Sequence, residues 1–81
     1  MRPRAKSVIP LDDYKLLITF SNDETKIFDV NPYLKLKPYE QLKNIGVFRT
    51  VRIAGLSIEW STGQDICPDE LYFNSRGDAY E

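Results

Sequence analysis

The sequence of 81 residues contains no histidine and a single cysteine, Cys67. One cysteine cannot form an internal disulfide, so folding does not require an oxidising compartment. Zinc sites usually combine several cysteine and histidine ligands, and we therefore expect neither a metal site nor a cofactor. Histidine is also the commonest general base near neutral pH, so its absence argues against an enzyme.

Long hydrophobic runs and glycine-rich loops are missing as well. No apolar stretch approaches the roughly 18 residues of a membrane helix. The basic start, residues 1–6, leads into only Val8 and Ile9 before Pro10, which is too short for a signal peptide. We therefore expect a cytoplasmic protein without membrane contact. No phosphate-binding loop is indicated, because the glycines stand singly at Gly46, Gly55, Gly63 and Gly77.

The composition is that of a folded protein. Hydrophobic residues make up 42% of the chain and charged residues 28%, and aromatic residues account for 12%, which predicts one domain over residues 1–81. We expect flexible ends, namely a basic arm at 1–5 and a polar tail at 74–81. Because so small a core gives little net stability, dimerisation or docking on a partner would add to it.

Charge is divided unevenly along the chain. Residues 1–56 contain ten Lys and Arg against six Asp and Glu, a balance of +4, whereas residues 57–81 contain one against six, a balance of −5. The two parts either attract each other within the domain or leave an acidic docking face. Nucleic-acid binding through the basic arm is a further alternative, but the net charge of −1 and the absence of a helix-turn-helix pattern argue against it.

β-Branched and aromatic residues predict strands at residues 6–11, 14–20 and 25–30. The polar segment Ser21–Glu24 predicts a four-residue turn that pairs Phe20 with Thr25. This register places Ile18 opposite Ile27. Both faces of the hairpin then carry apolar side chains, so the sheet needs cover on both sides.

Proline and glycine predict helical structure in the middle of the chain. Asn31-Pro32 indicates a short helical turn, and Pro38–Gly46 predicts a helix of about two turns with Gly46 as its left-handed cap. Spacing by three residues predicts that one side of this helix covers the sheet through Tyr39, Leu42 and Ile45.

A second hairpin is predicted with Gly55-Leu56 as its turn, of type II′, between strands at 48–54 and 57–61. One face then carries Ile53 opposite Ile58 and Val51 opposite Trp60, while Arg52 lies opposite Glu59 on the other face. Together the segments predict an α+β domain: a small antiparallel sheet of two hairpins, with about five strands, one short helix between them and a helical turn near the C-terminus.

The acidic segment from Asp65 to Glu70 contains the chain's one thiol. We interpret Cys67 as a small buried residue, because no histidine is present to act as its base. Pro68 then begins a one-turn helix, with Asp69 and Glu70 favourably placed near its N-terminus.

The order of these segments resembles the bacterial family of domains of unknown function numbered 2442 (DUF2442), over about residues 6–73. The resemblance is carried by the strands at 14–20 and 26–30, by the hairpin at 48–60 and by the run from Gly63 to Tyr72. It implies a small α+β domain, sometimes joined to a helix-turn-helix domain. It also implies frequent encoding beside another small protein, as in a toxin–antitoxin pair. No functional residues are established in that family, so none is carried over.

These observations predict a non-enzymatic, regulatory or antitoxin-like interaction module whose partner is another protein or a second copy of the chain. The residues expected to dock the partner are Trp60, Asp65, Asp69, Glu70 and Tyr72. The alternative is a small enzyme that uses Asp65, Asp69 or Tyr72 in a cleft beside Trp60.

Overall fold

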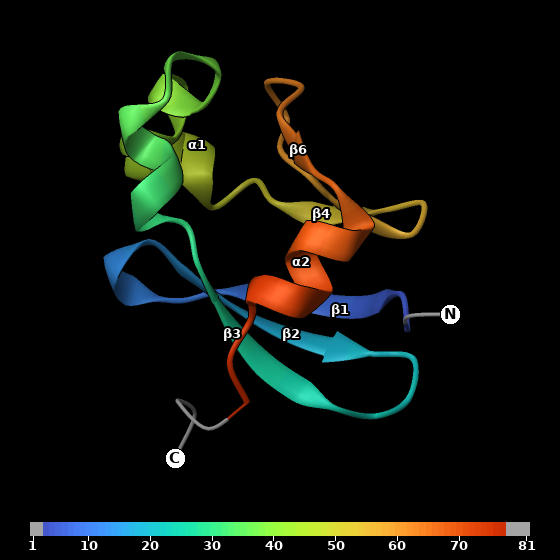
Figure 1. Cartoon of the computed structure of the whole chain (residues 1–81). Coiled ribbons are helices and arrows are strands. Elements are labelled where there is room, and N and C mark those ends of the chain that lie inside the picture. The colour runs from blue at the N-terminus through green and yellow to red at the C-terminus, as the bar shows by residue number, and fades with distance from the viewer. Residues whose placement is uncertain (1–2, 78–81) are drawn as a thin grey trace.

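The computed structural model describes residues 3–77, which form an α+β domain with two antiparallel three-stranded sheets. The strands are β1 (Ala5–Pro10), β2 (Lys15–Phe20) and β3 (Thr25–Asp29) in one sheet, and β4 (Arg52–Ala54), β5 (Ser57–Glu59) and β6 (Asp65–Ile66) in the other. The helices are η1 (Asp12–Tyr14), η2 (Asn31–Lys35), η3 (Lys37–Lys43), α1 (Ile45–Phe48) and α2 (Pro68–Asn74). The predicted class is confirmed, but the single sheet of about five strands is corrected to two sheets (Figure 1).

The first sheet confirms the predicted strands but not their register. Ile18 lies opposite Lys26 rather than Ile27. The predicted pair of Phe20 with Thr25 is therefore wrong by one residue. Every second residue of β2 is nevertheless fully buried, because alternate side chains of a strand share one face. These buried residues are Leu16, Ile18 and Phe20.

The loop of this hairpin explains the shift. The N–H of Asp23 donates to the carbonyl of Phe20, and the N–H of Phe20 donates to the carbonyl of Glu24, both at 2.8 Å. Asp23 has a φ of +70°. This is the three-residue loop in which a type I turn is followed by a left-handed residue. The predicted four-residue turn is therefore wrong. A left-handed aspartate is less common than a left-handed glycine, so the residue type at position 23 does not indicate this loop.

The middle of the chain is helical, as predicted, but differs in its details. The turn at Asn31-Pro32 is confirmed as η2. The segment predicted as one helix over 38–46 is instead the 3₁₀ helix η3 followed by the separate helix α1. Leu42 is fully buried as predicted, but Ile45 is 48% exposed and does not cover the sheet.

Asn44 is the reason for this break. Its backbone is extended, with φ −74° and ψ 117°, and its side-chain oxygen accepts hydrogen bonds from the N–H groups of Gly46 (2.9 Å) and Val47 (3.3 Å). An asparagine in this role caps the start of a helix. Gly46 therefore lies inside α1 and is not the predicted left-handed cap.

The second hairpin has the predicted register. Arg52 pairs with Glu59 and Ile53 with Ile58. Gly55 has a φ of +59°, whereas Leu56 is not among the residues with positive φ, as a type II′ turn requires. The predicted start of this strand at residue 48 is wrong, because the helix that Asn44 begins continues through residue 48.

Helix α2 begins at Pro68 as predicted and contains seven residues, longer than the single turn expected. Figure 1 shows α2 across the first sheet, and the ring of Tyr72 packs edge-on against that of Phe20 at a centroid distance of 5.0 Å. Side chains from both sheets and from the helices form one core, whose largest fully buried members are Trp60, Phe20, Phe28, Phe48, Leu16, Ile18, Leu42, Ile58, Ile66, Leu71 and Val30.

The two ends predicted to be flexible, 1–5 and 74–81, lie partly outside the described residues. Of the parts that are described, Ala5 begins β1 and is 3% exposed. Asn74 ends α2, and the backbone of Arg76 pairs with that of Ile27 at the edge of β3. The C-terminal segment thus adds backbone hydrogen bonds to the first sheet.

Candidate functional site

Trp60, one of the predicted docking residues, lies in the core. Its side chain is fully buried, and its indole N–H donates to the backbone carbonyl of Phe48 at 2.9 Å. The residue directly follows β5, so the strand directs it inward. A buried indole offers no atom to a partner, and we therefore assign Trp60 to packing.

Asp65 is exposed in β6, where its backbone carbonyl accepts a 3.0 Å hydrogen bond from the hydroxyl of Tyr39. It lines two open pockets, and neither of them is lined by Asp69 or Tyr72. Asp69 is half-buried in the first turn of α2. The three groups of the enzyme alternative do not meet in either pocket.

Tyr72 points toward the first hairpin. Its hydroxyl donates a 2.6 Å hydrogen bond to Oε1 of Glu24, and Nζ of Lys26 lies 3.9 Å from its ring centroid. The hydrogen bond from Tyr72 is the main cause that lowers the pKa of Glu24, and the same bond raises the pKa of Tyr72. These contacts fasten α2 to the turn between β2 and β3.

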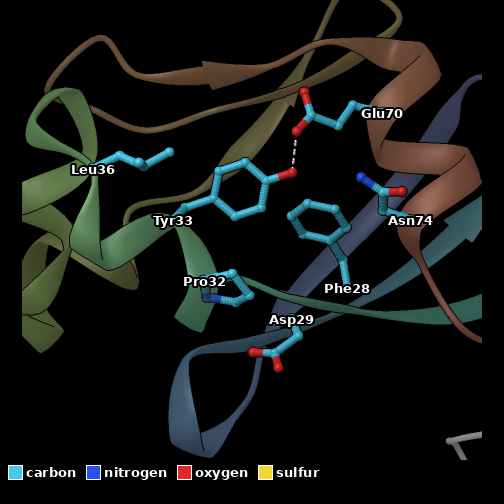
Figure 2. A pocket seen from close by; sticks show the side chains of 7 residues that line it. All are labelled: Phe28, Asp29, Pro32, Tyr33, Leu36, Glu70 and Asn74. Atoms are coloured by element: carbon cyan, nitrogen blue, oxygen red, sulfur yellow. Dashed lines mark hydrogen bonds between the residues drawn. The ribbon is translucent and has the colours of Figure 1, made fainter.

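Glu70 is the predicted residue that meets other chemically distinctive groups. It borders an open pocket of about 450 Å³ between η2, the end of β3 and α2, and the hydroxyl of Tyr33 donates a hydrogen bond to its Oε2. Figure 2 shows this bond at one end of the pocket, with the second oxygen of Glu70 directed away from the Tyr33 ring. The pocket is lined by Phe28, Asp29, Pro32, Tyr33, Leu36, Glu70 and Asn74.

Aromatic rings form the wall of this Glu70 pocket. The Tyr33 ring lies 5.5 Å from that of Phe28 and 5.4 Å, edge-on, from that of Tyr39. Burial, together with the hydrogen bond to Glu70, raises the pKa of Tyr33 to about 12. The phenol therefore stays protonated at neutral pH and holds the carboxylate as a donor.

Asp29 at the end of β3 also borders the pocket, but its carboxylate lies on the face of the strand opposite the buried Phe28, because successive side chains of a strand alternate (Figure 2). Oδ1 of Asp29 accepts hydrogen bonds from the backbone N–H of Asn31 (3.0 Å) and from its side-chain amide (2.8 Å). No basic residue is among those that line the pocket. The side chain of Leu36 is 51% exposed at its rim. The pocket thus combines the Glu70 carboxylate with aromatic and aliphatic surface.

Local sequence features place these groups, but their meeting was not predicted. Pro68 begins α2 and puts Glu70 in the first turn, and Pro32 places Tyr33 in η2 directly after β3. Both helix starts were predicted from the prolines. The pairing of Tyr33 with Glu70, 37 residues apart, was not predicted, because tertiary packing alone joins them.

Cys67 is exposed, so its interpretation as a buried residue is wrong. The physical reason is alternation along β6: Ile66 points into the core, so the next side chain points outward. Within residues 3–77, no group of three acidic, cysteine or histidine side chains is arranged to hold a metal ion. None of the helices in this range has the length and apolar character needed to cross a membrane.

Comparison with known proteins gives one positive result. The model of a family described as "Protein of unknown function (DUF2442)" matches residues 5–77, nearly the whole chain. No curated protein and no solved structure matches the chain. The resemblance inferred from the order of the strands and the run from Gly63 to Tyr72 is therefore confirmed.

Proposed function

The chain belongs to the DUF2442 family of proteins of unknown function, and we propose that it is a non-enzymatic interaction module that binds a partner protein. The partner docks on what we call the α2 face, made of the outer side of α2 and the Glu70 pocket. Its residues are Glu70, Phe73 and Asn74 on the helix, with Tyr33 and Leu36 beside them.

Phe73 is the observation that carries this proposal. Its side chain is 70% exposed, more than the other large exposed hydrophobic residues of the described chain. It lies three residues after Glu70 and one before Asn74, so one side of the helix presents all three. Exposed aromatic side chains beside a pocket are typical of protein interfaces, in which aromatic residues are enriched.

The arrangement of the acidic groups favours binding over catalysis. Glu70 accepts a hydrogen bond from Tyr33, and Glu24 accepts one from Tyr72. Both bonds support the fold by tying α2 to other elements. With Trp60 buried, the groups of the enzyme alternative have no cleft beside the indole.

The biological form that we propose is a regulatory or antitoxin-like module in the cytoplasm. A single exposed cysteine, which needs no oxidising compartment, supports that location. Binding of a second copy through the same face is the competing form, because a small core gains stability from either partner.

Site-specific photo-cross-linking in the source cell tests the proposal. Benzoylphenylalanine replaces Phe73 in one variant and Leu56 in the control, since Leu56 is also exposed (53%) but lies in the turn between β4 and β5. We expect one discrete adduct with a different protein from position 73 and none from position 56. Binding of that purified protein should fall at least tenfold in Phe73→Ser and stay unchanged in Leu56→Ser.

Two results would contradict the proposal. Equal adducts from both positions would show that α2 has no special role. An adduct from position 73 that contains only this chain would replace the partner protein by a homodimer, which sedimentation of the purified chain would then detect.

A further inference from the structure

We propose that the outer edge of β3 is a second interaction surface, which binds β3 of another copy of this chain when residues 75–77 move off it. This inference goes beyond the proposed function, because it concerns an edge of the first sheet and not the α2 face. Its basis is the direction of the backbone groups of β3 and the small extent of what covers them.

Of the two edges of the first sheet, the β3 edge suits a further strand. At the β1 edge, the N–H of Ala5 donates to the carbonyl of Leu56 at 3.2 Å, so the turn of the second hairpin lies against it. Pro10 at the end of β1 has no N–H to offer a neighbouring strand.

The cover on the β3 edge is small. The N–H of Arg76 donates to the carbonyl of Ile27 at 2.7 Å, and the N–H of Ile27 donates to the carbonyl of Arg76 at 3.1 Å. Within residues 3–77 this is one isolated antiparallel pair, formed by the segment that follows α2 and runs beside β3 (Figure 1). The edge thus already accepts an extended segment of antiparallel direction.

The hydrogen-bond pattern of the hairpin fixes which residues a further strand meets. The N–H of Val30 donates to the carbonyl of Tyr14 at 2.9 Å, toward the β2 side of the hairpin. Backbone groups of successive residues in a strand alternate between its two sides, so those of Thr25, Ile27 and Asp29 point outward. These three positions are evenly spaced around Ile27. A second copy in antiparallel direction can therefore place Ile27 opposite Ile27 and each Thr25 opposite an Asp29.

This register is better than its neighbours. A twofold interface uses the same patch of both copies, and centring on Ile27 engages the whole of β3, Thr25–Asp29. Centring on Asp29 would put two carboxylates opposite each other, which is destabilising. Centring on Thr25 would bring in Asp23, whose φ of +70° does not continue a strand. Each facing pair exchanges two hydrogen bonds, so a second copy offers β3 more bonds than Arg76 does.

Residues 75–77 act as the cover of this edge in the full chain. An uncovered edge strand is a template for pairing with another chain, and covering it with a further segment prevents such pairing. The short connection to α2 keeps the segment close to β3 and favours it over a second copy. Release of the segment converts an internal contact into an interface between two copies.

Sedimentation equilibrium of Arg76→Pro in the full chain tests the cover. Proline removes the N–H that donates to Ile27, and its ring occupies the place of that N–H, so the segment leaves the edge. We expect dimers with a dissociation constant about tenfold lower than that of the wild type. Arg76→Ala keeps the N–H and should behave as the wild type.

Charge at position 25 tests the register in the Arg76→Pro chain. Thr25→Lys lies opposite Asp29 of the second copy and should tighten the dimer about threefold, whereas Thr25→Asp should weaken it about threefold. Thr19→Asp is the control, because Thr19 pairs with Thr25 within the hairpin but lies on the central strand. It should change the dissociation constant less than about twofold. Far-UV circular dichroism establishes that the variants are folded.

The order Lys, Thr, Asp at position 25 is also expected in the wild-type chain at higher protein concentration, so the test does not depend on Arg76→Pro alone. A folded Arg76→Pro chain that dimerises no better than the wild type would overturn the cover. Equal dimerisation of the Lys and Asp variants would overturn the pairing of β3 with a second copy. The cross-link from position 73 tests the α2 face separately.

Discussion

The hydroxyl of Tyr72 donates a 2.6 Å hydrogen bond to Oε1 of Glu24, 48 residues earlier in the chain. The bond joins α2 to the turn of the first hairpin. Two residues earlier on the same helix, Glu70 accepts a hydrogen bond from the hydroxyl of Tyr33. Two tyrosine–glutamate pairs therefore hold the helix that carries Phe73.

The Tyr72–Glu24 pair should make stability depend on pH. The bond lowers the pKa of Glu24, so the folded protein favours the charged carboxylate. The resulting stability is present above the pKa of the unfolded chain, near 4.5, and is lost as the pH falls through the lower, folded value. In Tyr72→Phe, we expect the pKa of Glu24 to rise toward 4.5 and this part of the pH dependence to shrink.

NMR of the Glu24 carboxyl carbon measures this pKa directly over a range of about pH 2–7, which brackets the titration of a glutamate. Tyr39→Phe is the control, because the Tyr39 hydroxyl bonds to the carbonyl of Asp65 and not to Glu24. Its Glu24 titration should match that of the wild type. A Glu24 titration unchanged in Tyr72→Phe would show that the bond does not persist in solution.

Much of the fold followed from local patterns. The second hairpin was predicted with its register because Gly55 at the turn and alternating residues on both strands agree. The first hairpin was shifted by one residue because its loop depends on Asp23 in a left-handed conformation, which the residue type does not demand. The alternation of buried and less buried side chains along β2 does not depend on this shift, because it follows from the strand alone.

The helical middle was harder to predict because two signals compete there. Asn44 lies inside the segment whose proline and glycine suggested one continuous helix. Its side chain instead accepts hydrogen bonds from Gly46 and Val47, which begins a new helix. Glycine is unfavourable inside a helix, so its presence at position 46 suggested a helix end, whereas the cap at Asn44 makes it part of the next helix.

Asn44→Ala should destabilise the protein by about 1 kcal/mol, within the range of 0.5–2 kcal/mol known for helix caps. The alanine leaves the N–H groups of Gly46 and Val47 without their side-chain acceptor. Asn44→Asp keeps an acceptor oxygen at the cap and should lie close to the wild type. Urea unfolding of the three proteins measures the difference, and equal losses for Ala and Asp would show that capping is not the cause.

The candidate site shows where prediction from sequence ended. Glu70 and Tyr72 were named because they lie in one acidic segment, and successive positions on α2 point them to different partners, Tyr33 and Glu24. The aromatic wall comes from β3 and η2, far away in sequence. Nothing in the spacing of Phe28 and Tyr33 indicates a partner in α2, so only the folded chain reveals the pocket.

Trp60 supplies the sharpest test of whether the segment before Gly63 is structural. Its indole N–H donates to the buried carbonyl of Phe48 at 2.9 Å, and its side chain is fully buried. Trp60→Phe removes that donor and leaves a space in the core, so we expect a loss of about 1–3 kcal/mol in the free energy of unfolding. Far-UV circular dichroism during urea unfolding measures this loss without relying on tryptophan fluorescence.

Phe73→Leu is the control, because Phe73 is also aromatic but is 70% exposed. This substitution should change the free energy of unfolding by less than about 0.5 kcal/mol. Similar losses in the two variants would mean that the indole contributes no more to stability than a surface ring does, which would contradict the assignment of Trp60 to packing.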